Sequence, residues 1–314
     1  MTPEEIQYQI TNLHYDNQSA YSTRGRIRAI MNGGPDGILA LLGDQIKGFQ
    51  DYQIPVPNLM MSGLEHLSQK IGRIPNLKVD TPNGKDSERS KQKAEKIARI
   101  VTSYDETQKL ELQMPQVGRW LPGYGFAVWV IREKKGPDGT PYPCAELRDP
   151  YNCFPGYFGA DQQPKEMAII RRVPKEALAR TYPKYADQIN KKDVVNTLGV
   201  GSAYASAYTD SYNGSWANSN GQGDLVAEYY NEDGTYVFHM TSSTILDFIP
   251  NPLDSGPSFV IAKKFAFDKL QGQYDQIIGL MASMAKINVM SIIAMEDAVF
   301  TETNISGEIE SGQY

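Results

Sequence analysis

Few residues in this sequence could carry out catalysis or bind a metal ion. The three histidines, His14, His66 and His239, have no metal-ligand spacing to one another or to a cysteine, and the HExxH motif is absent. Cys144 could act as a nucleophile with His239 as its base. No local signature of a thiol enzyme surrounds it, however, so a structural cysteine is the favoured interpretation. A P-loop is also absent. The sequence therefore predicts a protein that is not an enzyme and has no metal site or cofactor.

Basic residues are the second group with possible chemistry, because lysine and arginine bind the phosphates of nucleic acids. The candidates for contact with DNA lie around a C-terminal helical segment: Lys263, Lys264, Lys269 and Lys286. A shorter basic cluster near the N-terminus consists of Arg24, Arg26 and Arg28. Solvated charge beside helices is the alternative for both groups. An aromatic tract has no adjacent basic residue, which favours subunit packing over base stacking: Tyr204, Tyr208, Tyr212 and Trp216.

Acidic residues dominate one stretch of the chain. Residues 193–262 contain no Lys or Arg and carry eight acids: Asp193, Asp210, Asp224, Glu228, Glu232, Asp233, Asp247 and Asp254. The whole chain has a net charge of −6, so the remainder carries +2 (−6 minus −8). Such a stretch could give a functional surface of one sign. Ordinary acidic decoration of a β-rich surface is the alternative.

Length and composition indicate a globular protein. The chain has 314 residues, of which 40% are hydrophobic and 22% charged, enough for a sizeable core and for two domains. Two cysteines cannot form a secreted disulfide framework, which favours a reducing compartment. The N-terminus has neither the basic nor the apolar region of a signal peptide, so none is expected.

The first part of the chain, residues 1–122, is predicted to be mostly helical. Thr2, Pro3 and Glu4–Glu5 form a helix start, and residues 59–71 and 86–104 have apolar side chains at helical spacing. A further helix is expected from Asp105 towards Trp120, with an interruption near Pro115.

The second part, residues 123–262, is predicted to be β-rich. Residues 126–131 and 144–148 are expected to pair across a glycine turn, and residues 225–230 and 235–240 to form a hairpin. Residues 167–173 favour another strand, and residues 174–182 a short helix. Between them and the hairpin, residues 199–224 are rich in Gly, Ser, Asn and Tyr and predict a flexible, acidic loop.

The last part, residues 263–314, contains the longest helical pattern. It runs from Asp268 to about Thr301 and would be about 50 Å long if unbroken. A membrane span over residues 277–295 is an alternative, which Lys286 and Asn288 disfavour. Packing in an oligomer fits better, with small residues that permit close approach: Gly279, Ala282, Ser283 and Ala285. A buried core helix of a monomer is the third possibility. Residues 302–314 are polar, and we expect them to begin a segment that the chain does not complete.

The order of these parts resembles the portal proteins of tailed bacteriophages. Residues 54–59 (IPVPNL) and 71–79 (IGRIPNLKV) are similar to the segment before the portal wing. Residues 123–131 (GYGFAVWVI) and 147–155 (LRDPYNCFP) are similar to the wing itself, and residues 267–278 (FDKLQGQYDQII) to the passage from wing to stem. The resemblance implies an α+β, portal-like fold with a helical N-terminal region, a β-rich wing and a long stem-type helix.

The resemblance also implies a function. Portal proteins form a ring, typically of twelve subunits, at one vertex of the viral capsid. Double-stranded DNA is packaged and ejected through this head-to-tail connector, which docks the terminase large subunit and later the tail or adaptor proteins. The implied location is the virion, in contact with the major capsid protein, after assembly in the host cytoplasm and without a membrane. Such proteins are usually longer than this chain, with a clip, a second stem helix, a tunnel loop and a crown.

Two other functions stay open. A head–tail adaptor or minor capsid protein without a DNA channel would assemble into a ring only with other virion proteins. A cytosolic enzyme that uses Cys144 or a pair of acids is the third hypothesis, and it lacks a set of residues with the geometry of an active site.

Overall fold

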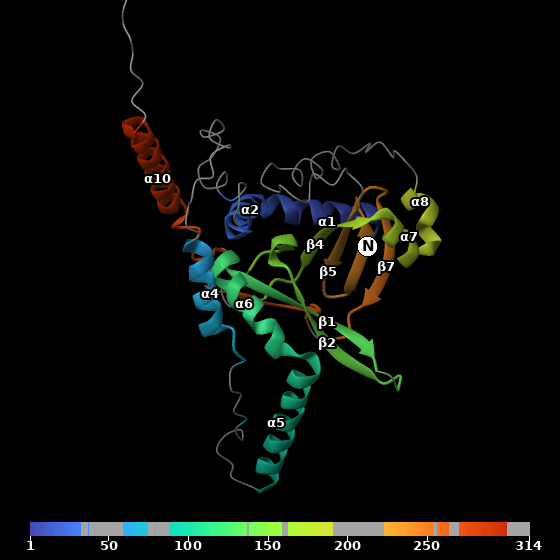
Figure 1. Cartoon of the computed structure of the whole chain (residues 1–314). Helices are drawn as coiled ribbons and strands as arrows, with labels where there is room; N and C mark the ends of the chain where they lie inside the picture. Colours follow the sequence, from blue (N-terminus) through green and yellow to red (C-terminus); the bar gives the residue numbers. More distant parts are fainter. Residues whose placement is uncertain are drawn as a thin grey trace, which may run out of the picture.

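The N-terminal helices form as their local signals dictate (Figure 1). The computed structural model describes residues 1–32, 37, 59–74, 79, 88–136, 138–158, 163–190, 223–253, 256–263 and 270–299. Helix α1 spans Pro3–Asp16 and α2 spans Gln18–Asn32. The Thr2 hydroxyl accepts from the Glu5 amide, and the Glu5 side chain accepts from the Thr2 amide, which completes a capping box. The predicted helix start is confirmed.

Three further helices precede the sheets: α4 (Leu59–Ile71), α5 (Glu88–Gln108) and α6 (Leu110–Tyr124). The prediction of a break near Pro115 is wrong. Pro115 lies inside α6, and the chain turns at Lys109, which has left-handed backbone angles (φ 51°, ψ 42°). The turn separates α5, which is polar and has no buried residue, from α6, which is more apolar and packs on α4. One contact between α4 and α6 is the Ser68 hydroxyl, which donates to the Pro115 carbonyl at 2.7 Å.

A three-stranded antiparallel sheet has the order β2 (Pro141–Arg148), β1 (Phe126–Lys135), β8 (Phe259–Lys263). The predicted pairing of residues 126–131 with 144–148 is confirmed, since Val128 lies opposite Arg148 and Ile131 opposite Ala145. β8 adds to the other side of β1 from more than a hundred residues further along the chain.

A five-stranded antiparallel sheet has its strands in chain order: β3 (Cys153–Pro155), β4 (Met167–Pro174), β5 (Gly223–Tyr230), β6 (Gly234–His239) and β7 (Thr244–Pro250). The predicted hairpin is confirmed, with Asn231 Oδ1 accepting from the Gly234 amide in the turn. The predicted loop over residues 199–224 ends two residues too late, because β5 already begins at Gly223. Asp224 is part of this strand and lies 3.0 Å from His239 of β6. Residues 199–222 lie outside the described part of the chain.

Short helices complete the elements: η3 (Pro150–Asn152), α7 (Lys175–Thr181), η4 (Pro183–Tyr185) and α8 (Ala186–Asn190). α7 lies where residues 174–182 predicted a helix. The mixture of helices with antiparallel sheets confirms the α+β class.

The five-stranded sheet buries side chains on both faces. On one face Ile6 and Ile10 of α1 pack with Ile170 and Phe238, and on the other Leu178 of α7 packs with Val226. The largest cluster joins this second face to the three-stranded sheet and to helices α2, α4 and α10, through residues such as Ile27, Met60, Leu64, Phe126, Met167, Tyr230 and Ile278.

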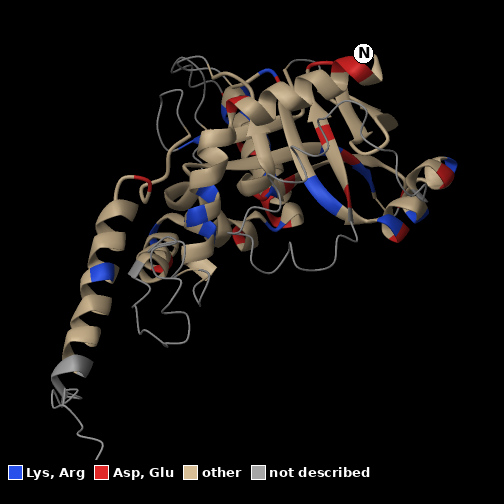
Figure 2. Ribbon diagram, turned by 90° about the horizontal axis from the view of Figure 1, so that it is seen from above, with Lys and Arg blue, Asp and Glu red and all other residues tan. Residues whose placement is uncertain are grey.

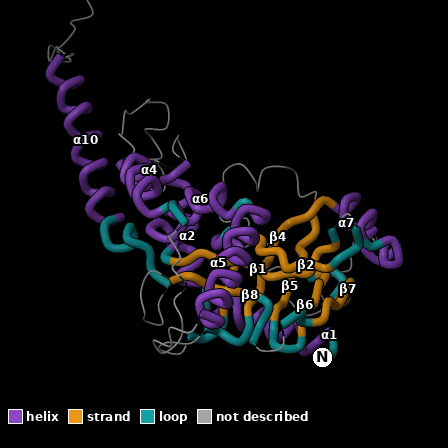
Figure 3. Tube along the Cα trace, turned by 90° about the horizontal axis from the view of Figure 1, so that it is seen from below, coloured by secondary structure: helices purple, strands orange, loops and turns teal. Residues whose placement is uncertain are grey.

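Helix α10 (Ile278–Val299) leaves this body at one end (Figures 1 and 3). The prediction of a helix from Asp268 is wrong, because the described residues 270–277 are not helical. Gln273 donates its amide to the Pro122 carbonyl at 2.7 Å, and Gly272 lies directly against the backbone of Gly123. These contacts fix the segment on the end of α6, so α10 is about 33 Å long instead of about 50 Å.

Candidate functional site

The lysines predicted to touch DNA have different surroundings. Lys263 ends β8, and its Nζ is buried 4.8 Å from the centre of the Phe158 ring, so it does not offer its charge to a large ligand. Lys286 is exposed on α10 and is the one Lys or Arg in that helix (Figure 2). Lys264 and Lys269 lie outside the described residues.

Two arginines of the N-terminal cluster, Arg24 and Arg28, make structural contacts. Arg24 is 2% exposed, and its Nη1 donates to the carbonyls of Pro150 (2.6 Å) and Cys153 (3.0 Å), while burial lowers the pKa of its guanidinium. Arg28 forms an ion pair with Asp149 at 3.1 Å and lies over the Tyr151 ring. Arg24 therefore neither contacts phosphate nor lies in solvent, because its donors bind α2 to η3 and β3.

Glu228, from the acidic stretch, is the centre of an ion network between the two sheets. Its carboxylate is 3% exposed and accepts from Arg132 of β1 at 2.6 Å and from Arg171 of β4 at 2.7 Å. Arg148 of β2 lies 3.8 Å away, and the Tyr230 hydroxyl donates at 2.6 Å. Burial alone would raise the pKa of Glu228, but Arg132, the Tyr230 hydrogen bond and Arg171 together hold it below its usual range.

Asp224, also from the acidic stretch, belongs to a buried chain of polar groups. One of its carboxylate oxygens lies 3.0 Å from His239 Nε2, and His239 Nδ1 lies 2.6 Å from the Ser242 hydroxyl. This order of acid, imidazole and hydroxyl is that of a hydrolase triad. His239 is 1% exposed, however, and the half-buried Ser242 donates its hydroxyl proton to Thr244 at 3.0 Å, so the hydroxyl does not donate to the imidazole as a triad serine does.

The pairing of Cys144 with His239 is not formed. Cys144 lies on β2 of the three-stranded sheet and is buried opposite Arg132, whereas the ring nitrogens of His239 face Asp224 and Ser242 on the other sheet. Burial raises the pKa of the second thiol, Cys153, far above its usual range. Within the described residues, no group of three His, Cys, Asp or Glu side chains could hold a metal ion.

Three acids of the stretch remain on the surface: Glu232, Asp233 and Asp247. The first two occupy the β5–β6 turn, which the Asn251 amide binds to the end of β7, and the third lies on β7 itself. The acidic stretch thus divides into a structural part and a small surface part. Asp193, Asp210 and Asp254 lie outside the described residues, as does the Tyr204–Trp216 tract.

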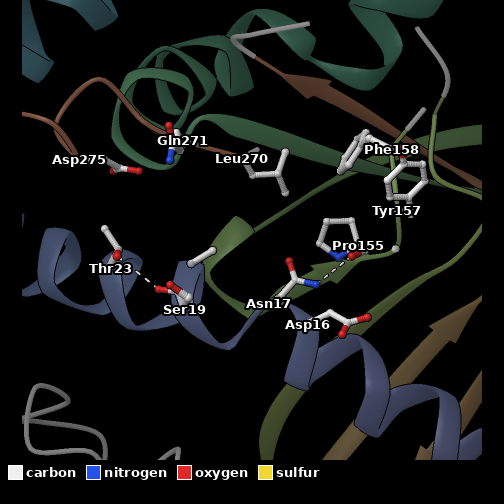
Figure 4. Close-up of a pocket in the computed structure, with 12 residues that line it drawn as sticks. Asp16, Asn17, Ser19, Thr23, Pro155, Tyr157, Phe158, Leu270, Gln271 and Asp275 are labelled. Carbon is white, nitrogen blue, oxygen red and sulfur yellow. Dashed lines mark hydrogen bonds between the residues drawn. The ribbon is translucent and has the colours of Figure 1, made fainter. Parts of the chain in front are cut away.

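A pocket of about 500 Å³ opens where α1 meets α2 (Figure 4). Asp16 and Asn17 line one side, Asp275 another, and the largely exposed Tyr157 stands at its edge. Asn17 donates to the Pro155 carbonyl at 2.9 Å, which fixes the junction to β3. The lining offers hydrogen-bond acceptors without a basic residue, and no pairing of a nucleophile with a base. Sequence analysis missed it because three distant segments build it.

The small residues of α10 do not form one face. Ala285 is 2% exposed and packs in the chain's own core, whereas Gly279 and Ser283 are exposed and Ala282 is half-buried. A methyl group on Gly279 would meet no described atom within 4 Å. Beside polar side chains such as Lys286 and Asn288, α10 exposes a stripe of large apolar ones: Leu280 (64%), Met284 (46%), Ile287 (63%) and Met290 (69%). Their 4-3-3 spacing could have identified this stripe from the sequence.

Residues Ile278–Met295 of α10 are also long and apolar enough to cross a membrane, judged by length and composition within the described chain. The hydroxyls of Ser283 and Ser291 donate to the carbonyls of Gly279 and Ile287, so they add little polarity to the helix surface. Core helices of globular proteins meet the same criterion, but most of this window is exposed, so the interpretation of α10 as a buried core helix is wrong.

Comparison with known protein families and with curated proteins gives no match for this chain.

Proposed function

We propose that this chain is a portal-type subunit, which forms a ring around a channel for double-stranded DNA. The observation that carries the proposal is α10, a 22-residue helix that leaves the body with a stripe of large apolar side chains exposed. In water such a stripe is stabilised by burial against a partner, at about 25 cal/mol per Å² of apolar surface. The resemblance to portal proteins supplies the partner, which is the same helix region of the next copy around the ring.

The charges on the surface fit a passage that does not hold DNA tightly. Lys286 is the exposed cation of α10, and a ring of about twelve copies would repeat it around the axis. One lysine per copy gives weak, evenly spaced phosphate contacts that depend on salt and do not read sequence. DNA can then slide through the ring while a terminase motor drives it. The capsid, tail and adaptor partners follow from the same resemblance.

A head–tail adaptor is the second candidate. It shares the exposed α10 stripe, but it closes into a ring only on another virion protein. A protein anchored in a membrane by α10 is a further possibility, and the experiment must distinguish it from a ring-forming subunit.

Negative-stain microscopy of the purified chain tests the proposal. A portal-type subunit gives closed rings with a central hole in the absence of other proteins and lipid. Monomers or dimers at all concentrations would overturn the proposal in favour of the adaptor. Flotation of the chain with phosphatidylcholine vesicles, together with the absence of rings, would overturn it in favour of a membrane anchor.

A further inference from the structure

Helix α5 is an exposed element with a strong charge pattern. It has no buried residue over Glu88–Gln108. Its first half, residues 88–99, carries five basic residues against the two acids Glu88 and Glu95, a net charge of +3: Arg89, Lys91, Lys93, Lys96 and Arg99. Ile97 and Ile100 on the same helix are 44% and 58% exposed. An amphipathic helix of this kind is typically covered by a partner.

The position of α5 keeps it away from most of its own chain. Its last residue, Gln108, donates to the Pro143 carbonyl of β2 at 3.2 Å, which holds this end on the three-stranded sheet. The basic half projects from the lower end of α6 in Figure 1, whereas β7 lies at the right of the body.

Strand β7 presents the complementary pattern. It is the last strand in the order of the five-stranded sheet, and its residues Phe248 and Ile249 are 42% and 38% exposed. Beside them lie the exposed carboxylates of Asp247, Glu232 and Asp233. The β5–β6 turn is tied to the end of β7, since the Asn251 amide donates to the Asp233 carbonyl at 3.1 Å. We name the surface of these five residues the β7 edge.

We propose that the basic half of α5 docks on the β7 edge of a second copy of this chain. Three cations, Lys93, Lys96 and Arg99, would meet three carboxylates, one of which, that of Glu232, lies 3.6 Å from Lys165 Nζ in the single chain. Ile97 and Ile100 would cover Ile249, since Phe248 faces the other side of the sheet and packs on Tyr236. A helix over an edge strand also closes an edge that would otherwise recruit other strands. α5 is about 32 Å long and β7 about 24 Å, so the helix can span the strand.

This contact joins two different surfaces, so it propagates from copy to copy in one direction. A heterologous contact of this kind produces a closed ring or an open filament. The inference rests on the proposed ring and names the surfaces that would close it. Nucleic acid is the other ligand that a basic helix could bind, but the exposed isoleucines among the cations favour a protein surface.

Charge reversal with complementation tests the docking. Variant A carries Lys93→Glu, Lys96→Glu and Arg99→Glu on α5, and variant B carries Glu232→Lys, Asp233→Lys and Asp247→Lys on the β7 edge. Each variant alone places like charges at every junction, so we expect at least a tenfold loss of assembly by light scattering after gel filtration. Mixing A with B restores opposite charges at every junction and restores assembly. The control Lys70→Glu with Arg73→Glu changes exposed charges on and next to α4 and leaves assembly unchanged.

The outcomes separate this inference from the proposed function. If the unaltered chain forms rings and A and B also do, the docking is wrong while the ring stands. If the unaltered chain forms an open filament instead, the ring is wrong while the docking stands, and if it forms neither, both are wrong. Should A or B fail to fold, a disulfide test replaces them: Lys96→Cys is mixed with Asp247→Cys under oxidation. A cross-linked dimer that appears only in the mixture supports the docking, and its absence overturns it. Binding of duplex DNA to the unaltered chain that variant A loses, with assembly intact, would assign α5 to nucleic acid instead.

Discussion

The sheet body, which is the two sheets and the helices packed on them, differs from the projecting helices α5 and α10 in the contacts of its side chains. In the body, even charged groups find partners inside the chain, as Glu228 does with Arg132 and Arg171. On α5 and α10, large apolar groups such as Ile100, Leu280 and Ile287 face outwards. Inside the body the charged groups are therefore paired within the chain, whereas the two helices and the β7 edge need a partner outside it. Changes inside the body should act on folding, and changes on the helices or on the β7 edge should act on assembly.

Neutralising Glu228 should have the largest effect on folding. Glu228→Gln leaves three arginines around a buried site without their shared anion, which should lower the free energy of unfolding by about 3 kcal/mol. Urea unfolding followed by circular dichroism measures this loss. Glu133→Gln, an exposed position on β1, is the matched control and should change little. Equal stabilities of the two variants would show that the network does not hold the sheets together.

The joint between body and helix comes next. In Gly272→Ala the new methyl group would overlap the Gly123 carbonyl oxygen, so the backbone must shift, at a cost of about 2 kcal/mol. In Gly279→Ala, in the first turn of α10, the new methyl group would contact no described atom, so the change should stabilise the helix by up to about 1 kcal/mol. Thermal unfolding of the two variants should shift in opposite directions. A loss of stability in both would place α10 differently from the structure described.

A pH effect should separate the body from the helices in the same protein. Burial, aided by the charge of Arg24, lowers the pKa of His14 to about 4, from 6.5 in the unfolded chain. Between these values the unfolded state binds the proton and the folded state does not, so stability falls as pH drops from 6.5 to 4. His14→Phe keeps a ring beside Phe154 and should reduce that slope of melting temperature against pH. An unchanged slope would assign it to other groups.

Polar substitution on α10 should have the smallest effect on folding. Leu280→Ser with Ile287→Ser removes exposed apolar groups, so the unfolding free energy of a dissociated subunit should stay within about 0.5 kcal/mol. Sedimentation velocity should show loss of the assembled species at the same time. A large loss of stability with unchanged sedimentation would mean that the stripe is covered within one chain.

Local signals explain what the sequence predicts correctly. The capping box at Thr2 and the turn at Asn231–Gly234 each lie within a few residues, so the helix start and the hairpin can be read directly. The break at Lys109 could not be read, because it follows from the packing of α6 on α4 and not from a helix-breaking residue.

Long-range contacts explain what sequence reasoning missed at the candidate sites. The eight acids of residues 193–262 suggested one surface because no basic residue stands among them. Strand pairing brings Arg132, Arg148 and Arg171 to Glu228 from outside that stretch, which removes it from the surface. In the same way, the sequence around Arg24 indicates a solvated cation, because the carbonyls of η3 and β3 that bind its guanidinium come from more than a hundred residues further along the chain.

Native mass spectrometry of the unaltered chain and of the Leu280→Ser, Ile287→Ser variant tests the central claim most directly. If the projecting helices close against other copies, the unaltered chain of 35.0 kDa appears as one large species, near 420 kDa for about twelve copies, and the variant as a monomer. A monomer from both proteins over the whole concentration range would contradict the account.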